Sequence, residues 1–483
     1  MGKFRRHKPC VLGFMLIWAS VLLGLTCSSG QITQAATPTT QQVAATSNQT
    51  PKPQGAAQKF GQYVTVTSSN YSVWGNFDWA VRNQSAKLYH HTYLAKVAYH
   101  HANGSTYYSL YAGKKWLGYL NARAVKVGQG AQGGAVATNQ YVTITKKNFT
   151  VWGDFAWRKK RANTKNAYHV TLQAKIIYYH SNGSAYYSLY RNGKWFGYLN
   201  ASAVQVAKGA QGIAVGANKY VKITSKRATV WGGFNWQSKH LTKNWFNHVF
   251  QVKCVYYHSN GSVYYSLYQD GWWFGYLNAT ATKASTKPKA TARSYAATSK
   301  TAKKTDQIVG VVASGSHAQV YLFEKSGGIW VQAVSVAGRV GYNGVGTARE
   351  GSGRTPRGAY PLTFAFGTGK NPGTKLTYRQ ITEQSYYISN PKDKQYNTWQ
   401  ERRKSSSKDE HLADYPVQYQ YGIVIGYNHG VGGGSAFFLH VNGRGATAGC
   451  VSVPRSTMLS FMRRIHNGAR IINVTSAAQL AKY

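Results

Sequence analysis

Three copies of one pattern, spaced 78 to 79 residues apart, constrain the fold of this chain more than any other feature. The spacing is read from Trp74, Trp152 and Trp231, which stand in the segments VWGNFDW, VWGDFAW and VWGGFNW. Each copy opens with YVTVT, YVTIT or YVKIT and later carries NGS, YYSLY and then WLGYLNA or WFGYLNA. The sequence therefore predicts at least three similar folded units in its N-terminal part.

Each copy has the pattern of β structure. Short runs of Tyr, Val, Ile and Thr alternate with polar residues, as in KVAYHHANGSTYYSLY, and Asn-Gly separates two such runs. Asn-Gly between alternating runs is a strong β-hairpin signal. We expect small β barrels or rolls over residues 61–128, 139–207 and 218–283, joined by flexible connectors rich in Gly and Ala.

The copies share a terminal W-x-G-Y-L pattern, at Trp116–Leu120, Trp195–Leu199 and Trp273–Leu277. With this pattern they resemble the GW family of SH3-like wall-attachment modules, although Gly-Tyr stands where that family usually has Gly-Trp. The resemblance implies binding to lipoteichoic acid or peptidoglycan. The repeated Trp and Tyr are expected mainly in the module cores, with stacking on sugars as the alternative for exposed ones. Cys254 aligns with apolar residues in the other copies and is expected to be a buried small hydrophobe.

The charge of the chain is very uneven. There are 58 Lys and Arg against 12 Asp and Glu, a net charge of +46, and residues 1–306 hold 38 of the basic and 4 of the acidic residues. A basic surface of this size favours a polyanionic partner. For an exported protein we expect teichoic acids or other anionic wall polymers and no nucleic acid; a merely solvated basic surface is the alternative.

The first 36 residues have the architecture of a cleaved signal peptide. Four basic residues precede an uncharged apolar run of about 15 residues, which is shorter than a membrane-spanning helix, and a small-residue stretch ending in QAA follows. A lipoprotein attached through Cys27 is a minor alternative. Residues 37–60 are expected to be a linker. No later segment is long and apolar enough to span a bilayer, so we expect a secreted, wall-associated protein without stable membrane insertion.

A different domain follows the repeats. Residues 284–306, rich in Lys, Thr, Ala and Ser, are expected to be a basic linker, and residues 307–475 a separate β-rich domain. Removal of the signal peptide leaves two cysteines, Cys254 and Cys450, in what the pattern indicates are different domains. An unpaired thiol in an exported protein is a candidate reactive group.

The candidate chemistry lies in FFLHVNGRGATAGCVSVP, residues 437–454. A strand-like run carries His440, and a Gly-rich loop delivers Cys450 ten residues later. Acyl transfer needs a thiolate, a base for the thiol proton and donors for an oxyanion; His440 is the candidate base, and the amides of Gly449 and Cys450 are candidate donors. A structural cysteine fits the spacing as well, and His429 is a competing base. No cofactor or metal site is expected.

This stretch resembles the catalytic motif of L,D-transpeptidases of the YkuD type, in which Cys ends a Ser/Thr-His-Gly-Cys signature and a His upstream is the base. The segment EGSGRTPRG, residues 350–358, resembles the substrate-side segment of that family. By position, the resemblance implies that Cys450 is the nucleophile and His440 the proton carrier, with Gly449 beside the oxyanion. Two departures are Ala448, where the signature has His, and Ser452, where many members have Arg or Asn.

The expected architecture is thus mostly β, with three SH3-like modules followed by a β-rich L,D-transpeptidase domain. The resemblance implies that the enzyme attacks peptidoglycan stem peptides, releases D-Ala and passes the acyl group to an amine of a neighbouring stem. Arg444 and Arg455 are candidate substrate-binding residues. The alternatives are an L,D-carboxypeptidase, with water as acceptor, and a wall-binding or adhesive protein whose C-terminal domain has lost activity.

Overall fold

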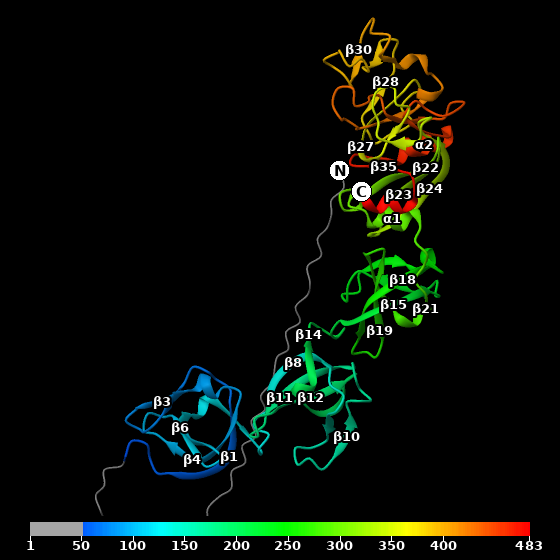
Figure 1. Cartoon of the computed structure of the whole chain (residues 1–483). Helices are drawn as coiled ribbons and strands as arrows, with labels where there is room; N and C mark the ends of the chain where they lie inside the picture. The colour runs from blue at the N-terminus through cyan, green and yellow to red at the C-terminus, as the bar shows by residue number, and fades with distance from the viewer. Residues whose placement is uncertain (1–51) are drawn as a thin grey trace, which may run out of the picture. The chain divides into compact units, whose positions relative to one another are not determined.

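The computed structural model describes residues 52–483 (Figure 1). The expected signal peptide, residues 1–36, and most of the first expected linker lie outside the described residues. None of the helices within residues 52–483 is long and apolar enough to cross a membrane. The described chain is mostly β, as the sequence predicts, and consists of three small modules and a larger C-terminal domain.

The three modules repeat one set of seven strands. The strands of the first module are β1 (Gln58–Val66), β2 (Ser72–Trp74), β3 (Val81–Gln84), β4 (Thr92–His100), β5 (Thr106–Ala112), β6 (Lys115–Asn121) and β7 (Val125–Gly128). Those of the second are β8 (Val136–Ile144), β9 (Thr150–Trp152), β10 (Lys160–Asn163), β11 (Thr171–Tyr179), β12 (Ala185–Arg191), β13 (Lys194–Asn200) and β14 (Val204–Ala207). Those of the third are β15 (Val215–Ile223), β16 (Thr229–Trp231), β17 (Ser238–Leu241), β18 (Val249–Tyr257), β19 (Val263–Gln269), β20 (Trp272–Asn278) and β21 (Thr282–Ser285).

Within each module the strands form one sheet with the same order, β3-β2-β6-β5-β4-β1-β7 in the first copy. The Asn-Gly signal marks the β4–β5 hairpin: Gly104 has a φ of +79°, and the Asn103 side chain accepts a hydrogen bond from the Ser105 amide at 2.9 Å. The expected connectors are not free of the modules, because Gly134 donates to Thr65 Oγ1 at 2.8 Å and Ile213 donates to Thr143 Oγ1 at 3.2 Å.

The module cores are mainly aliphatic. Val64, Val73, Leu110 and Leu120 of the first copy are fully buried, and the other copies bury the equivalent residues. Most of the repeated Trp and Tyr are instead half-buried and pack against one another. The prediction that the repeated aromatic residues mainly fill the cores is therefore wrong for most of them, and only a few are buried. Cys254 is half-buried and lies in β18 opposite Ser266.

The C-terminal domain contains two short helices and the remaining strands. Its helices are α1 (Ala292–Thr298) and α2 (Arg455–Arg464). Its strands are β22 (Gln307–Ser314), β23 (His317–Ser326), β24 (Ile329–Arg339), β25 (Val345–Gly346), β26 (Thr355–Pro356), β27 (Gly358–Gly367), β28 (Tyr378–Gln380), β29 (Ser385–Tyr387), β30 (Trp399–Glu401), β31 (Glu410–His411), β32 (Gly422–Ile425), β33 (Phe438–Val441), β34 (Val451–Val453) and β35 (Arg470–Val474).

The main sheet of this domain closes on itself. Its strand order is β28-β27-β32-β33-β34-β24-β23-β22-β35, and β35 pairs a second time, with β27, so that eight strands form a ring. Aliphatic residues of these strands and the apolar side of α2 fill the core. Residues between β28 and β32 form a separate sheet of three short strands, β30-β29-β31, which lies beside the barrel (Figure 1).

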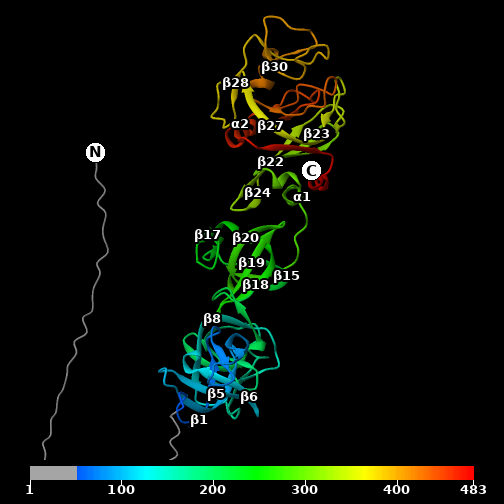
Figure 2. The ribbon, with the colours of Figure 1, turned by 90° about the vertical axis from the view of Figure 1, so that its left-hand side faces the viewer.

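The stretch that was expected to be a linker, residues 284–306, contains α1. The helix begins with a capping box at Thr291 and buries Ala296 and Ala297 against Trp330 and Leu480. In both views α1 lies beside the C-terminus of the chain, and the Thr301 amide donates to the Tyr483 carbonyl at 2.8 Å (Figures 1 and 2). Small Ala residues let this short helix pack closely although the segment lacks large apolar side chains, so the domain includes α1 and extends to Tyr483.

Candidate active site

Two neighbouring strands of the barrel bring Cys450 and His440 together. β33 carries His440, and β34 begins directly after Cys450. The two strands are parallel, with His440 opposite Ser452 and Leu439 opposite Val451. The parallel pairing explains the ten-residue spacing of His440 and Cys450, because residues 442–449 form the loop that brings the chain back to the end at which β33 begins.

The thiol of Cys450 is buried and held by two backbone groups. The Phe438 amide donates to Sγ at 3.3 Å, and the thiol donates to the Ala436 carbonyl at 3.3 Å. Burial raises the pKa of the Cys450 thiol strongly, the negative charge of Glu410 raises it further, and the Phe438 amide lowers it by a smaller amount. The resting Cys450 side chain is therefore a neutral thiol.

The imidazole of His440 is oriented for accepting a proton. Its Nδ1 lies 2.8 Å from the Val441 carbonyl, and since a carbonyl can only accept, Nδ1 carries the proton and Nε2 has the free lone pair. The ring meets Tyr419 edge-on, with centroids 5.3 Å apart and an interplanar angle of 90°. Burial lowers the pKa of His440 to about 4, against the smaller opposite effect of the hydrogen bond to Val441.

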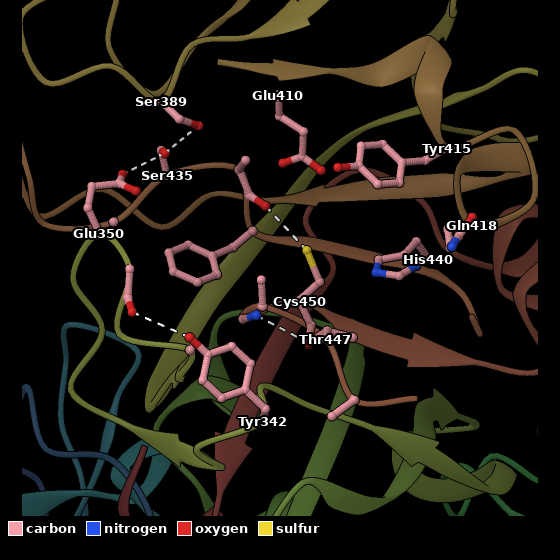
Figure 3. Close-up of a pocket in the computed structure, with 18 of the residues that line it drawn as sticks. Tyr342, Glu350, Ser389, Glu410, Tyr415, Gln418, Ser435, His440, Thr447 and Cys450 are labelled. Atoms are coloured by element: carbon pink, nitrogen blue, oxygen red, sulfur yellow. Dashed lines mark hydrogen bonds between the residues drawn. The ribbon is translucent and has the colours of Figure 1, made fainter. Parts of the chain in front are cut away.

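Both groups point into one pocket of about 540 Å³. Figure 3 shows the sulfur of Cys450 and the ring of His440 facing the same space below Glu410. Among the hydrogen bonds of residues 52–483, none joins Cys450 to His440. With a raised thiol pKa and a lowered imidazole pKa, the pair rests uncharged, as a thiol and a neutral imidazole.

The loop that ends in Cys450 is fixed by Thr447. Its hydroxyl donates to the Cys450 carbonyl at 2.6 Å and accepts from the Gly449 amide at 3.2 Å. Gly449 has no room for a side chain, because a Cβ there would lie 2.6 Å from Cε1 of Phe437. In the free protein the Gly449 amide is thus occupied by a long hydrogen bond to Thr447.

The segment predicted to lie on the substrate side reaches the same place. Glu350, Gly351 and Gly353 line the pocket, and the hydroxyl of Thr355 donates to the Cys450 carbonyl at 3.3 Å. Glu350 accepts a hydrogen bond from Ser435 at 2.6 Å, which ties the segment to the loop before β33 (Figure 3).

The other sequence candidates separate clearly. Arg444 is exposed and lines the pocket. Arg455 does not line it; this residue begins α2 and donates from Nε to Gln420 at 2.6 Å, so its role in substrate binding stays a prediction. His429 is exposed, stacks on Tyr427 and does not line the pocket either. Ala448 lies at the pocket and presents no polar side chain to it. Ser452 is buried beside His440 on β34, and its hydroxyl has no hydrogen-bond partner within residues 52–483.

Three acidic residues line the pocket: Glu350, Asp409 and Glu410. The sequence predicted Glu350, as the first residue of the segment at 350–358, but it did not predict Asp409 or Glu410. Glu410 is half-buried, and its carboxylate accepts a hydrogen bond from the Tyr419 hydroxyl. Burial raises the pKa of Glu410 to about 7, with a further increase from Glu350 and an opposing effect of Tyr419. The one sequence feature that could have indicated Asp409 and Glu410 is that adjacent Asp and Glu are rare in so basic a chain.

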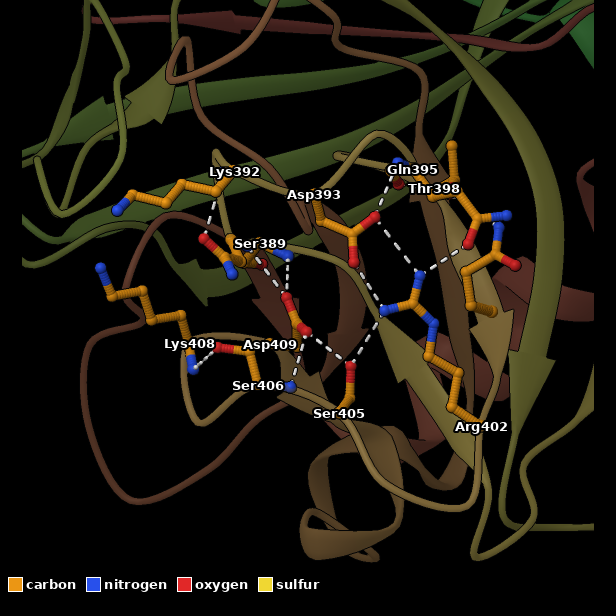
Figure 4. A network of polar contacts seen from close by, with 12 residues as sticks. Ser389, Lys392, Asp393, Gln395, Thr398, Arg402, Ser405, Ser406, Lys408 and Asp409 are labelled. Atoms are coloured by element: carbon orange, nitrogen blue, oxygen red, sulfur yellow. Dashed lines mark hydrogen bonds and ion pairs between the residues drawn. The ribbon is translucent and has the colours of Figure 1, made fainter.

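A polar network holds the backbone next to Glu410 in place (Figure 4). The Asp409 carboxylate accepts hydrogen bonds from the amides of Ser389 and Asn390, both at 2.9 Å, and from the Ser405 hydroxyl at 2.5 Å. Burial alone would raise the pKa of Asp409, but these hydrogen bonds outweigh it and keep the pKa below its ordinary value. Nearby, Arg402 pairs with Asp393 at 2.6 Å.

Comparison with known proteins identifies the C-terminal domain. Residues 308–473 match the family model of the YkuD L,D-transpeptidase catalytic domain. No curated protein matches the chain. A crystal structure of a suggested autolysin from Listeria monocytogenes shares 16% identity over 47% of this chain and 97% of that one, with a TM-score of 0.18, which is too low to support an argument. The family match and the closed β barrel agree: the C-terminal domain of this chain is an L,D-transpeptidase catalytic domain of the YkuD family.

Proposed function

We propose that this protein is an exported peptidoglycan L,D-transpeptidase in which Cys450 is the nucleophile and His440 the general base. The observation that carries the proposal is the pairing of β33 with β34, which places a buried thiol and an imidazole with a free Nε2 in one pocket of an L,D-transpeptidase domain. The three basic modules hold the enzyme at anionic wall polymers, and residues 1–36 direct export.

In the first step, the thiol proton passes to Nε2 of His440 as the sulfur attacks the carbonyl that precedes the terminal D-Ala of a stem tetrapeptide. The oxyanion is stabilised by the amides of Gly449 and Cys450, with Gly449 exchanging its 3.2 Å hydrogen bond to Thr447 for the shorter one. The imidazolium then gives its proton to the departing D-Ala nitrogen, leaving a thioester on Cys450. Arg444, at the mouth of the pocket, binds a carboxylate of the stem peptide.

Intact mass after incubation with a carbapenem, a β-lactam that acylates such nucleophiles, tests the assignment. We expect a covalent adduct on the full chain and on Cys254→Ala, which lacks the other thiol of the described chain. We expect no adduct on Cys450→Ala. For His440→Gln we expect the acylation rate to fall by at least about 100-fold, the effect of losing a general base. An adduct on Cys450→Ala, or none on a folded wild-type chain, would contradict the proposal.

A further inference from the structure

The Glu410 carboxylate is one of the ionisable groups of the pocket that the thiol and imidazole chemistry does not use. It lines the same pocket as Cys450 and His440, and its charge reaches the thiol. Tyr419 donates to Oε1, whereas no donor within residues 52–483 reaches Oε2. No Lys, Arg or His of the described chain forms an ion pair with Glu410. The pocket therefore contains a carboxylate with one oxygen unpaired and no ion-pair partner, although Arg349, Lys408 and Arg444 also line this pocket.

The backbone around Glu410 is fixed so that this carboxylate cannot easily turn away. Glu410 pairs with Tyr387 in the sheet formed by β29 and β31, and the preceding Asp409 is bound by the amides of Ser389 and Asn390 (Figure 4). In Figure 3 the carboxylate projects from the pocket wall above Cys450 and His440. A group held in this position faces whatever approaches the acyl group on Cys450.

The second half of a transpeptidation needs an additional proton acceptor. An amine acceptor reaches the enzyme mostly as an ammonium ion, which is not a nucleophile until it loses one proton. After the attack the same nitrogen loses a second proton, which His440 carries to the departing thiolate. One base cannot hold both protons at once. An ammonium ion also supplies the ion-pair partner that Glu410 lacks.

We infer that Glu410 is the acceptor-side base, which binds the ammonium group of the incoming stem and takes its first proton. This inference rests on the proposed function. The ammonium gives one proton to Oε2 of Glu410, and the neutral amine attacks the thioester carbonyl. The tetrahedral adduct passes its second nitrogen proton to His440, the C–S bond breaks, and His440 returns that proton to the Cys450 sulfur. Glu410 then releases its proton to water, and the amide product leaves.

The charge state of Glu410 suits this role. A pKa raised to about 7 makes Glu410 a stronger base than an ordinary carboxylate, leaves part of it ionised at neutral pH, and allows it to release an accepted proton to water afterwards. The titratable groups coupled to this carboxylate are Glu350, Tyr387, Tyr415, Tyr419 and the thiol of Cys450, all of them acidic. Arg349, Lys408 and Arg444 line the same pocket, but none of them forms an ion pair with Glu410, so this carboxylate is available to an incoming ammonium group.

The test compares two nucleophiles on one acyl-enzyme. The full chain is first acylated with stem tetrapeptide, in its diaminopimelate and lysine forms. The thioester then reacts with one of two nucleophiles at pH 7.5: a lysine-containing peptide, whose amine is protonated at this pH, or hydroxylamine, which is mostly uncharged. For Glu410→Gln we expect transfer to the lysine amine to fall about 100-fold, the usual range for a lost general base, while transfer to hydroxylamine changes less than about threefold. Acylation should be unchanged or faster, since a negative charge near the thiol is removed.

Matched variants separate this role from support of the fold. Glu410→Asp should recover part of the amine transfer, and Tyr419→Phe, which keeps the ring against His440, should lose much less of it. Glu401→Gln removes a carboxylate of the same small sheet that does not line the pocket and should behave as wild type. Equal losses with both nucleophiles, or no loss with either, would overturn the inference alone. Absence of an acyl-enzyme on the wild-type chain would refute the proposed function and this inference with it.

Discussion

At the scale of single residues, burial determines the protonation states of Cys450 and His440 through their pKa values. A thiolate–imidazolium pair at rest would require a thiol pKa below that of the imidazole. Here burial acts in the opposite direction on both groups, raising the pKa of Cys450 and lowering that of His440 to about 4. In the proposed mechanism the thiolate therefore forms only during attack, and the His440 imidazole is uncharged at every pH well above about 4.

These protonation states predict how the alkylation rate of the Cys450 thiol changes with pH. In a chain lacking residues 1–36 and carrying Cys254→Ala, Cys450 is the single cysteine, and its alkylation by iodoacetamide can be followed directly by mass. Because the thiol pKa is raised, we expect the rate to keep increasing with pH beyond about 9, where an ordinary thiol begins to level off. Glu410→Gln should shift the curve toward lower pH. A plateau between about pH 5 and 7 would indicate a resting ion pair and contradict these protonation states.

At the scale of secondary-structure elements, the position of α1 decides where the catalytic domain begins. Ala296 is fully buried in the cluster with Trp330 and Leu480, whereas Ala290, six residues earlier, is exposed. The substitution Ala296→Glu would place an unpaired carboxylate in that cluster, and we expect it to lower the free energy of unfolding by about 3 kcal/mol. Ala290→Glu makes the same chemical change at an exposed position and should alter it by less than about 0.5 kcal/mol.

Urea unfolding of the C-terminal domain, followed by tryptophan fluorescence, measures both variants in the full chain. Equal stability of Ala296→Glu and Ala290→Glu would mean that α1 does not contribute to the domain, as expected of a linker.

The elements also differ in how far the sequence could predict them. Repetition and the Asn-Gly turns predicted the modules, because hairpins are local. The motif at residues 437–454 located Cys450 and His440, because β33 and β34 lie a short loop apart. Closure of the barrel depends on pairing of β27 with β35, more than 100 residues away, which no local pattern encodes. Glu410 reaches the pocket only through the folding of residues between β28 and β32, so no motif marked it.

At the scale of the whole molecule, basic residues recur at equivalent places in the modules. In every copy a cation lies over the Trp ring of the strand before the last: Arg82 over Trp116, Arg161 over Trp195 and Lys239 over Trp273, at 4.8, 4.7 and 4.2 Å. A Lys lies similarly over a Tyr ring in each copy, at 4.0, 4.5 and 4.3 Å. Repetition of these pairs gives each module the same cations held over aromatic rings, and all of them except the half-buried Lys239 are exposed to an anionic partner.

This repetition predicts additive and salt-dependent attachment to cell walls. Several weak contacts on one chain raise the effective concentration of the enzyme at a polymer, so removal of residues 53–285 should abolish sedimentation with purified walls, and removal of one module should weaken it by about tenfold or more. Raising salt from about 50 to 200 mM should weaken binding of the full chain by at least about tenfold, because neutralised phosphates release counterions. Walls extracted to remove anionic polymers are the control and should bind poorly at either salt concentration. Binding that changed with neither salt nor extraction would mean that the positive charge is only solvated, and the half-buried Trp and Tyr of the modules would then be the residues that recognise the wall.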